Sequence, residues 1–160
     1  MHAPLRHVPR PRRRCRVPTR DHDDRRAVDL KAIWAEDVAA VERLLRDGAD
    51  VHAAGATGRT PLMQAAEAEN LRIIDRLLEA GADVNATGDA GQTALHCAVD
   101  MAIDGAIQND REVSAQSIVT IERLLRAGAD VHARDDRGQS PADWARRDSL
   151  VLAFIQRARP

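Results

Sequence analysis

Histidine, cysteine and aspartate side chains are the residues of this sequence that could do chemistry. His96 and Cys97 are adjacent and have the residue types of a base and a thiol nucleophile. Neighbours on a helix point about 100° apart, so the base would not reach the thiol. Asp100 and Asp104 are one helical turn apart, but charged residues at this spacing more often form a solvated face than a catalytic pair. Neither pair predicts a catalytic site.

Two further histidines, His52 and His132, share one position of a recurring block, with Asn85 at that position in the block between them. Stacked helical layers are about 8 to 10 Å apart, which puts residues two layers apart about 20 Å from each other. Zinc ligands lie about 2 Å from the ion, so the two histidines cannot share one. The sequence also contains no phosphate-binding loop and no G-x-S-x-G motif. We therefore predict no metal, no cofactor and no enzymatic activity.

The recurring block is the end of a helix. It reads RLLRDGADVHA at 43–53, RLLEAGADVNA at 76–86 and RLLRAGADVHA at 123–133. Its glycines, Gly48, Gly81 and Gly128, are 33 and 47 residues apart. A period in this range indicates stacked supersecondary units, and glycine ends a helix because it adopts the left-handed conformation without a Cβ clash.

The starts of helices recur as well. Thr60-Pro61 and Ser140-Pro141 combine a capping hydroxyl with a proline at the first helical position, and Thr93-Ala94 keeps the hydroxyl alone. The 160 residues include one Phe, two Trp and no Tyr. The core must then consist of Leu, Ile, Val and Ala packed between helices, which predicts an all-α fold.

The segment GRTPLMQAAEAENLRIIDRLLEAGADVNA at 58–86 resembles an ankyrin repeat. GQTALHCAV at 91–99 resembles the start of another, with His96 at the family's histidine position. The resemblance covers roughly residues 27–158 and implies an all-α solenoid of about four stacked helix-turn-helix units with short β-hairpin loops. It also implies that the protein binds other proteins and that His96 is a structural residue.

The repeat register divides the chain. The predicted parts are a disordered Arg/Pro-rich arm (1–22) and an ankyrin repeat domain (23–160), comprising an N-terminal capping unit (27–58), a repeat (59–91), a repeat with a 14-residue insertion (92–137) and a C-terminal capping unit (138–160). Glu36 and Glu69 stand where the family prefers glycine. If their backbones are left-handed, each costs about 1 kcal/mol.

The insertion lies within residues 100–117. Gly105 and residues 108–110 are expected to end the first helix of the unit, and the second helix is expected to begin near Glu112, which would give a lengthened helical finger. Insertions in solenoids often serve binding, yet long loops are tolerated at little thermodynamic cost. Both interpretations stay open.

The resemblance assigns partner binding to the hairpin tips and the concave face of the first helices. The predicted contact residues are Arg59, Gln64, Glu67, Asp89, Gln92, Asp100, Met101, Asp136, Arg137 and Gln139. Ala56, Thr57, Ala90 and Cys97 adjoin them. Four of the predicted contact residues are acidic, so we expect a protein partner with a basic or mixed surface.

Charge is distributed unevenly along the chain. Residues 1–20 contain seven Arg and no Asp or Glu, and the other 140 residues have 17 basic against 25 acidic side chains. Blocks of like charge are usually disordered tails. The alternative is a nucleic-acid-associated factor whose arm neutralises phosphates. No aromatic residue is interleaved in the arm for base stacking, which favours the tail.

Location and assembly are also predicted from the sequence. Cys15 and Cys97 show no pairing logic, and no apolar run approaches the length of a membrane span or a signal peptide. A cytoplasmic protein with no membrane contact is expected, and the strong Arg bias, with Lys31 as the single lysine, indicates a GC-rich bacterial gene. We expect a monomer. Self-association through an uncovered apolar end at Val151, Phe154 and Ile155 is the alternative.

Overall fold

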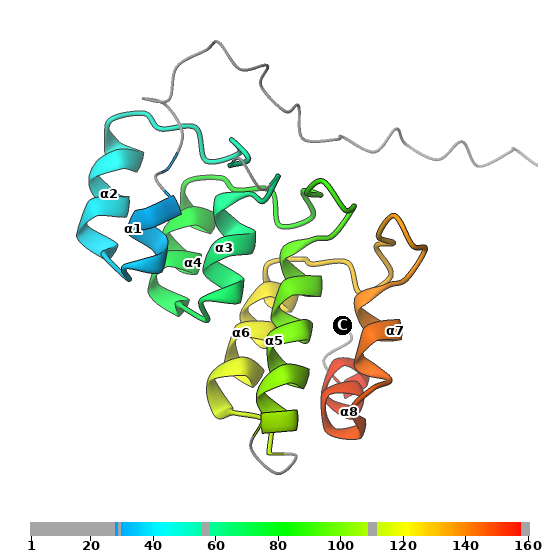
Figure 1. Ribbon diagram of the computed structural model, residues 1–160. Helices are drawn as coiled ribbons and strands as arrows, with labels where there is room; N and C mark the ends of the chain where they lie inside the picture. Colours follow the sequence, from blue (N-terminus) through cyan, green and yellow to red (C-terminus); the bar gives the residue numbers. More distant parts are fainter. Residues whose placement is uncertain (1–27, 29, 56–57, 109–111, 158–160) are drawn as a thin grey trace, which may run out of the picture.

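Pairs of helices stack one after another along the chain in the computed structural model (Figure 1). The structure describes residues 28, 30–55, 58–108 and 112–157. Within these ranges the helices are α1 (Leu30–Trp34), α2 (Val38–Arg46), α3 (Pro61–Glu67), α4 (Leu71–Glu79), α5 (Ala94–Gln108), α6 (Ala115–Arg126), α7 (Pro141–Ala145) and α8 (Ser149–Arg157). The predicted all-α fold is confirmed. The arm at residues 1–22 lies outside the described residues.

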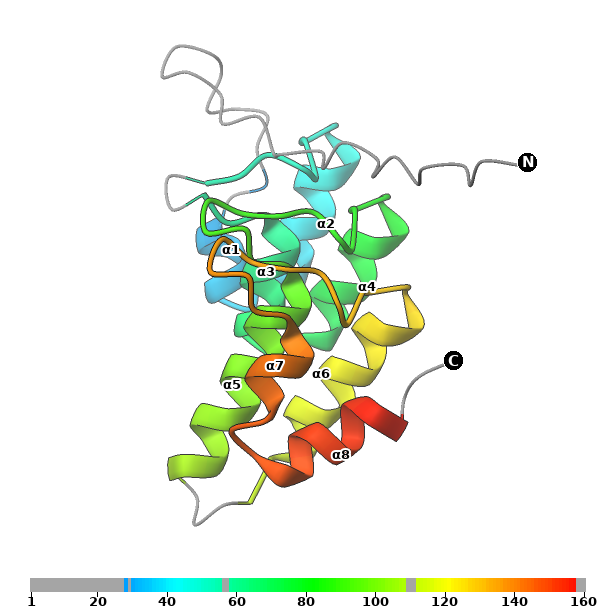
Figure 2. The same ribbon diagram turned by 90° about the vertical axis from the view of Figure 1, so that its right-hand side faces the viewer.

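The helices form two layers. The first helices of the pairs, α1, α3, α5 and α7, lie in one layer, and α2, α4, α6 and α8 lie in the other (Figure 2). Within the first layer, which we call the inner layer, α1 packs on α3, α3 on α5 and α5 on α7. Equivalent positions of successive units therefore lie side by side on one surface of the molecule.

The predicted capping residues begin and end helices. Thr60 caps α3 and Ser140 caps α7, each accepting a hydrogen bond from the backbone N–H three residues further on. Gly48, Gly81 and Gly128 follow α2, α4 and α6 with φ of 82°, 89° and 92°. This is the left-handed conformation that glycine adopts at low cost after a helix.

Aliphatic side chains fill the space between the layers. Ile74 and Leu77 of α4 are buried, and so are Ile121 and Leu124 of α6, 47 residues further along the chain. Leu95 of α5 is completely buried, on the helix that packs between α3 and α7. The core therefore recurs from unit to unit with the sequence.

The inserted residues lengthen both helices of the third pair. α5 has 15 residues against 7 in α3 and runs through Gly105 to Gln108, and α6 has 12 residues and begins at Ala115. The predicted break at Gly105 is wrong. α6 begins three residues after Glu112, and this is earlier than the repeat period requires, because Leu71 at the start of α4 corresponds to Ile118. Residues 109–111, which include the rest of the predicted break, lie outside the described residues.

Burial and capping explain where these two helices end and begin. A glycine inside a helix costs only about 1 kcal/mol relative to alanine. Ala102, Ile103 and Ala106 are buried on either side of Gly105, so packing holds this part of α5 helical. Ser114 accepts a hydrogen bond from the Ser117 N–H at 3.0 Å, and this cap sets the start of α6.

Glu36 and Glu69 occupy equivalent turns, between α1 and α2 and between α3 and α4. Both have left-handed backbones, with φ of 55° and 52°. Each donates its N–H to the carbonyl three residues earlier, Glu36 to Ile33 and Glu69 to Ala66. Both positions thus have the left-handed backbone considered in the sequence analysis, a conformation that costs about 1 kcal/mol for a residue other than glycine.

Candidate functional site

Three tight turns with the same hydrogen bonds connect the helix pairs. The N–H groups of Gly55, Gly88 and Asp135 each donate to the carbonyl four residues further on, at 2.9 Å. The accepting residues are Arg59, Gln92 and Gln139. Three of the predicted contact residues thus occupy one equivalent position at the base of three successive tips.

The tips are joined to one another by close packing. The Asp136 N–H donates to the Ala90 carbonyl at 3.0 Å. A Cβ at Gly91 would lie 2.7 Å from the Asp136 carboxylate, so the glycine leaves the space that this side chain fills. Asp89 lies in the same way against Gly58. The exposed residues Asp89, Asp136 and Arg137 therefore form one continuous edge, while Ala56 and Thr57 lie outside the described residues.

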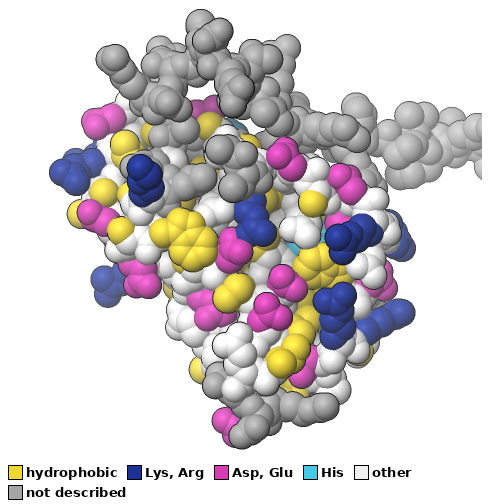
Figure 3. Space-filling view, viewed as in Figure 1, with side chains coloured by type: hydrophobic (Ala, Val, Ile, Leu, Met, Phe, Trp, Pro, Cys, Tyr) yellow, Lys and Arg dark blue, Asp and Glu magenta, His cyan; other side chains and the backbone are white. Residues whose placement is uncertain are grey.

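Four equivalent positions form a row across the inner layer, at the C-terminal ends of α1 and α3, within α5 and after α7. The residues of this inner row are Trp34, Glu67, Asp100 and Arg147, spaced by 33, 33 and 47 residues. Trp34 is 55% exposed, Glu67 and Asp100 are half-buried, and Arg147 is exposed. Figure 3 shows acidic side chains gathered over α3 and α5 in the middle of this face. An aromatic, two acidic and one basic side chain thus follow one another across it.

Gln64 holds Trp34 in place. The Trp34 Nε1–H donates to the Gln64 Oε1 at 2.5 Å. Gln64 is only 5% exposed, so this predicted contact residue has little surface of its own to offer a partner. Its contribution to the face is the orientation of the exposed indole.

Carboxylates in the centre of the face carry a local excess of negative charge. Arg59 forms an ion pair with Glu67, and this hydrogen bond raises the pKa of the Arg59 guanidinium. Burial raises the pKa of the Asp100 carboxyl, and the like charge of Asp104 adds to the rise. Among the described residues, neither aspartate makes an ion pair or a side-chain hydrogen bond. A cation brought by a partner would relieve this repulsion.

His96 and Cys97 have structural surroundings. The Thr93 N–H donates to His96 Nδ1 at 3.1 Å, and Nε2 of the ring donates to the Gln139 carbonyl at 3.2 Å. His96 is completely buried, and its ring meets Trp144 edge-on at 5.4 Å between centroids. Burial raises the pKa of the Cys97 thiol to about 12, so the thiol is protonated at neutral pH.

His96 and Asp143 have the same structural role in successive units. They occupy positions 47 residues apart, and each accepts a hydrogen bond from the N–H of the residue that precedes its helix, Thr93 or Ser140. From the sequence, we expect the Thr93 hydroxyl to cap the free N–H groups at the start of α5. Its hydroxyl instead contacts His96 Nδ1 at 3.0 Å.

Within the ranges given above, no group of three or more His, Cys, Asp or Glu side chains could hold a metal ion. In the same part of the chain, no helix is long and apolar enough to cross a membrane.

The structure adds two residues that the sequence prediction omitted. Trp34 and Arg147 complete the inner row, of which only Glu67 and Asp100 were predicted. The signal was available in the spacing, because both lie at the same position of the period as Glu67. The sequence prediction places contact residues only in the units that match the family closely. The two end units, which contain Trp34 and Arg147, do not match it closely. Met101, the neighbour of Asp100, is half-buried.

Comparison with known protein families gives two matches. A model described as ankyrin repeats (3 copies) matches residues 30–109, and a model described as ankyrin repeat matches residues 90–136. The two matches together contain α1 to α6, whereas α7 and α8 lie beyond them. A comparison with curated proteins gives no match.

Proposed function

The chain belongs to the ankyrin repeat family, and from this premise we propose that it is a non-catalytic scaffold that binds one protein partner through its hairpin tips and inner row. Ankyrin repeats generally mediate protein–protein interaction, and as a family they are generally non-catalytic. Their stacked units create extended binding surfaces. We also infer a cytoplasmic location, as the sequence predicts.

The observation that carries the proposal is the exposed inner row. Core positions recur in every unit, but the row changes from Trp34 to Glu67, Asp100 and Arg147. A tryptophan that is 55% exposed is an unusual surface residue in a chain with so few aromatic side chains. Tryptophan and arginine are the residue types most enriched among the side chains that dominate binding energy at protein interfaces.

The charges on this face favour a partner with basic groups. Burial, and next the like charge of Asp104, raises the pKa of the Asp100 carboxyl, and Asp89 and Asp136 are exposed at the tips. An arginine or lysine of the partner would be attracted to these carboxylates and could also stack on Trp34. Arg137 and Arg147 are exposed on the same face, so the partner surface is expected to be basic or mixed.

The test is a pull-down from a nuclease-treated lysate of the source organism, with the full chain as bait. Trp34→Ala is expected to weaken retention of a stoichiometric partner about 30-fold, the effect of losing roughly 2 kcal/mol at an interface. Asp89→Arg combined with Asp136→Arg is expected to weaken it about tenfold. Asp47→Arg is the control, because it reverses an exposed charge at the end of α2, away from the inner layer.

The result that would overturn the proposal is equally specific. If retention survives both face variants, this face is not the binding site. If a partner is retained only from a parallel lysate without nuclease, and only when residues 1–22 are present, the function belongs to the arginine arm and its salt-dependent binding of nucleic acid.

A further inference from the structure

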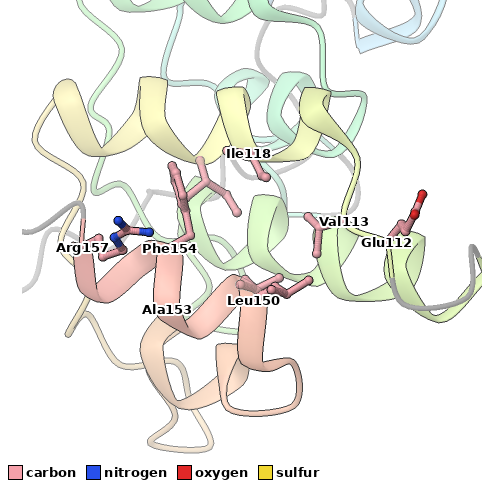
Figure 4. A pocket seen from close by; sticks show the side chains of 9 residues that line it. Glu112, Val113, Ile118, Leu150, Ala153, Phe154 and Arg157 are labelled. Atoms are coloured by element: carbon pink, nitrogen blue, oxygen red, sulfur yellow. The ribbon is translucent and has the colours of Figure 1, made fainter.

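A second surface, formed by other side chains than the inner row, is an apolar groove between α6 and α8. Its volume is about 370 Å³. It is lined by Glu112, Val113, Ile118, Ile121, Leu150, Val151, Ala153, Phe154 and Arg157. Figure 4 shows Leu150 and Phe154 on α8 facing Val113 and Ile118 across the space. We call this the α6–α8 groove.

The groove exists because α8 has two apolar faces and only one is covered. Val151 and Ile155 are 1% exposed and belong to the core, so of the three residues considered for an uncovered apolar end only Phe154 remains accessible. Leu150 is 59% exposed, and Phe154 is only half-buried. Together with Ala153 between them, they form a stripe at the spacing of one helix face. These side chains remain accessible on the side of α8 that borders the groove.

The two ends of the α6–α8 groove carry opposite charges. Glu112 lies at one end and Arg157 at the other (Figure 4). Both side chains are exposed, and neither makes an ion pair with another described residue. Asp148 precedes the N-terminal end of α8, where its carboxylate accepts hydrogen bonds from the N–H groups of Leu150 and Val151. Glu112 thus makes one end of the groove acidic, and Arg157 makes the other end basic.

A surface with this charge pattern is complementary to itself. A two-fold rotation brings the same patch of both subunits together and exchanges its ends. Two copies of α8 would then lie antiparallel, with Glu112 of each chain next to Arg157 of the other. Leu150 and Phe154 of each copy would enter the groove of its partner. We propose that the α6–α8 groove is a self-association surface whose occupant is the α8 helix of a second copy of this chain.

The size of the contact limits its strength. A helix of nine residues, Ser149–Arg157, is about 13.5 Å long. Two such helices bury less surface than the roughly 800 Å² per partner of a standard stable interface. The dimer is therefore expected to form at micromolar or higher concentrations, and the monomer expected from the sequence is the form present in dilute solution. This assembly does not depend on the proposed partner at the inner row.

Sedimentation equilibrium of the full chain over a range of concentrations tests the proposal. Glu112→Arg and Arg157→Glu are each expected to weaken dimerisation about tenfold, because each places two pairs of like charges at the ends of the groove. Equal amounts of the two variants should dimerise with one another about as well as the original chain. In that mixed dimer every Glu or Arg at one end again faces its opposite.

Two further variants separate the groove from a general apolar effect. Leu150→Asp is expected to abolish dimerisation. Ile107→Asp is the matched control, because Ile107 is 73% exposed on α5 and does not line the groove. Circular dichroism of all variants shows whether the fold is retained.

Three results would overturn the proposal. The first is a chain that stays monomeric to millimolar concentration, and the second is a dimer that Leu150→Asp does not weaken. The third is a pair of charge variants that fail to associate when mixed. A monomer whose groove instead binds a helix of a different protein, with loss of binding on Leu150→Asp, would assign the groove to that other occupant.

Discussion

The inner row and the α6–α8 groove lie on the same stack of helix pairs but originate in opposite ways. The row consists of one side chain per unit, placed by the same position of the repeat four times. The groove lies between α6 and α8, where the apolar side chains of the two helices leave a space between them. Repetition thus predicts where variable polar residues meet, whereas the groove depends on how two particular helices pack against each other.

The largest effect is expected from comparing a repeated core position with the groove. Leu95→Ala removes a completely buried side chain of α5 and should lower the free energy of unfolding by about 2–5 kcal/mol. Leu150→Ala removes a side chain that is 59% exposed and should change it by less than about 0.5 kcal/mol. Urea unfolding followed by circular dichroism measures both, at a concentration below that of any dimer. Similar losses for the two variants would mean that α8 packs more deeply than the structure shows.

A middle-sized effect tests the connection between the regular units and the last one. His96 in α5 bonds to Gln139, which lies just before α7. His96→Gln should destabilise the protein by about 1–3 kcal/mol, because buried hydrogen-bonding groups lose their partner. Thermal unfolding at pH 7.5 provides the measurement.

The same histidine predicts a pH dependence with a definite sign. Burial lowers the pKa of His96 below its usual value, and the Gln139 carbonyl and Asp135 oppose this shift in part. The unfolded chain therefore binds the proton more readily than the folded chain. The stabilising contribution is present above the ordinary histidine pKa of about 6.5 and is lost as the pH falls from there through the folded-state pKa. Unfolding curves between pH 7.5 and 5.5 should show a smaller loss in His96→Gln than in the original chain, and identical slopes would contradict this assignment.

The smallest effect is expected from substituting glycine for the glutamate in each of two equivalent turns. Glu36→Gly should stabilise the protein by about 1 kcal/mol, because it relieves a left-handed backbone. Glu69→Gly relieves the same strain but removes the carboxylate that accepts a hydrogen bond from Ser117 in α6, worth about 1 kcal/mol. Its net effect should be close to zero. If both variants stabilise equally in urea unfolding, the contact between Glu69 and the lengthened helix contributes nothing.

Local signals account for the parts of the fold that the sequence predicts. Thr60 and Ser140 mark helix starts through capping, and Gly81 marks a helix end through its backbone conformation. Both effects depend on only a few neighbouring residues. The break predicted at Gly105 is wrong because burial of the residues beside it outweighs the roughly 1 kcal/mol by which a glycine destabilises a helix. Burial depends on the whole fold and has no local signal. Capping by Ser114, rather than the apolar pattern after Glu112, likewise decides where α6 begins.

The predicted contact residues follow the repeat period in position, but the period does not determine how exposed each of them is. Gln92 and Gln139 lie where the period places them, at equivalent turns. Gln64 is at the expected position too, but its contact with Trp34 could not be found from spacing alone, since it joins side chains of neighbouring units. The α6–α8 groove depends on how α8 packs against α6, a tertiary relationship without a local signal.

The inner row has a consequence for how such a protein changes over generations. Each unit contributes one residue to the inner row, here Trp, Glu, Asp and Arg, while the core residues follow a pattern that the units share. Duplicating, deleting or exchanging a unit would change the order of residues in the row and leave the residues of the other units unchanged, because each unit packs only on its neighbours. Gene rearrangement, and not only point mutation, is therefore a route by which this scaffold can acquire a new partner.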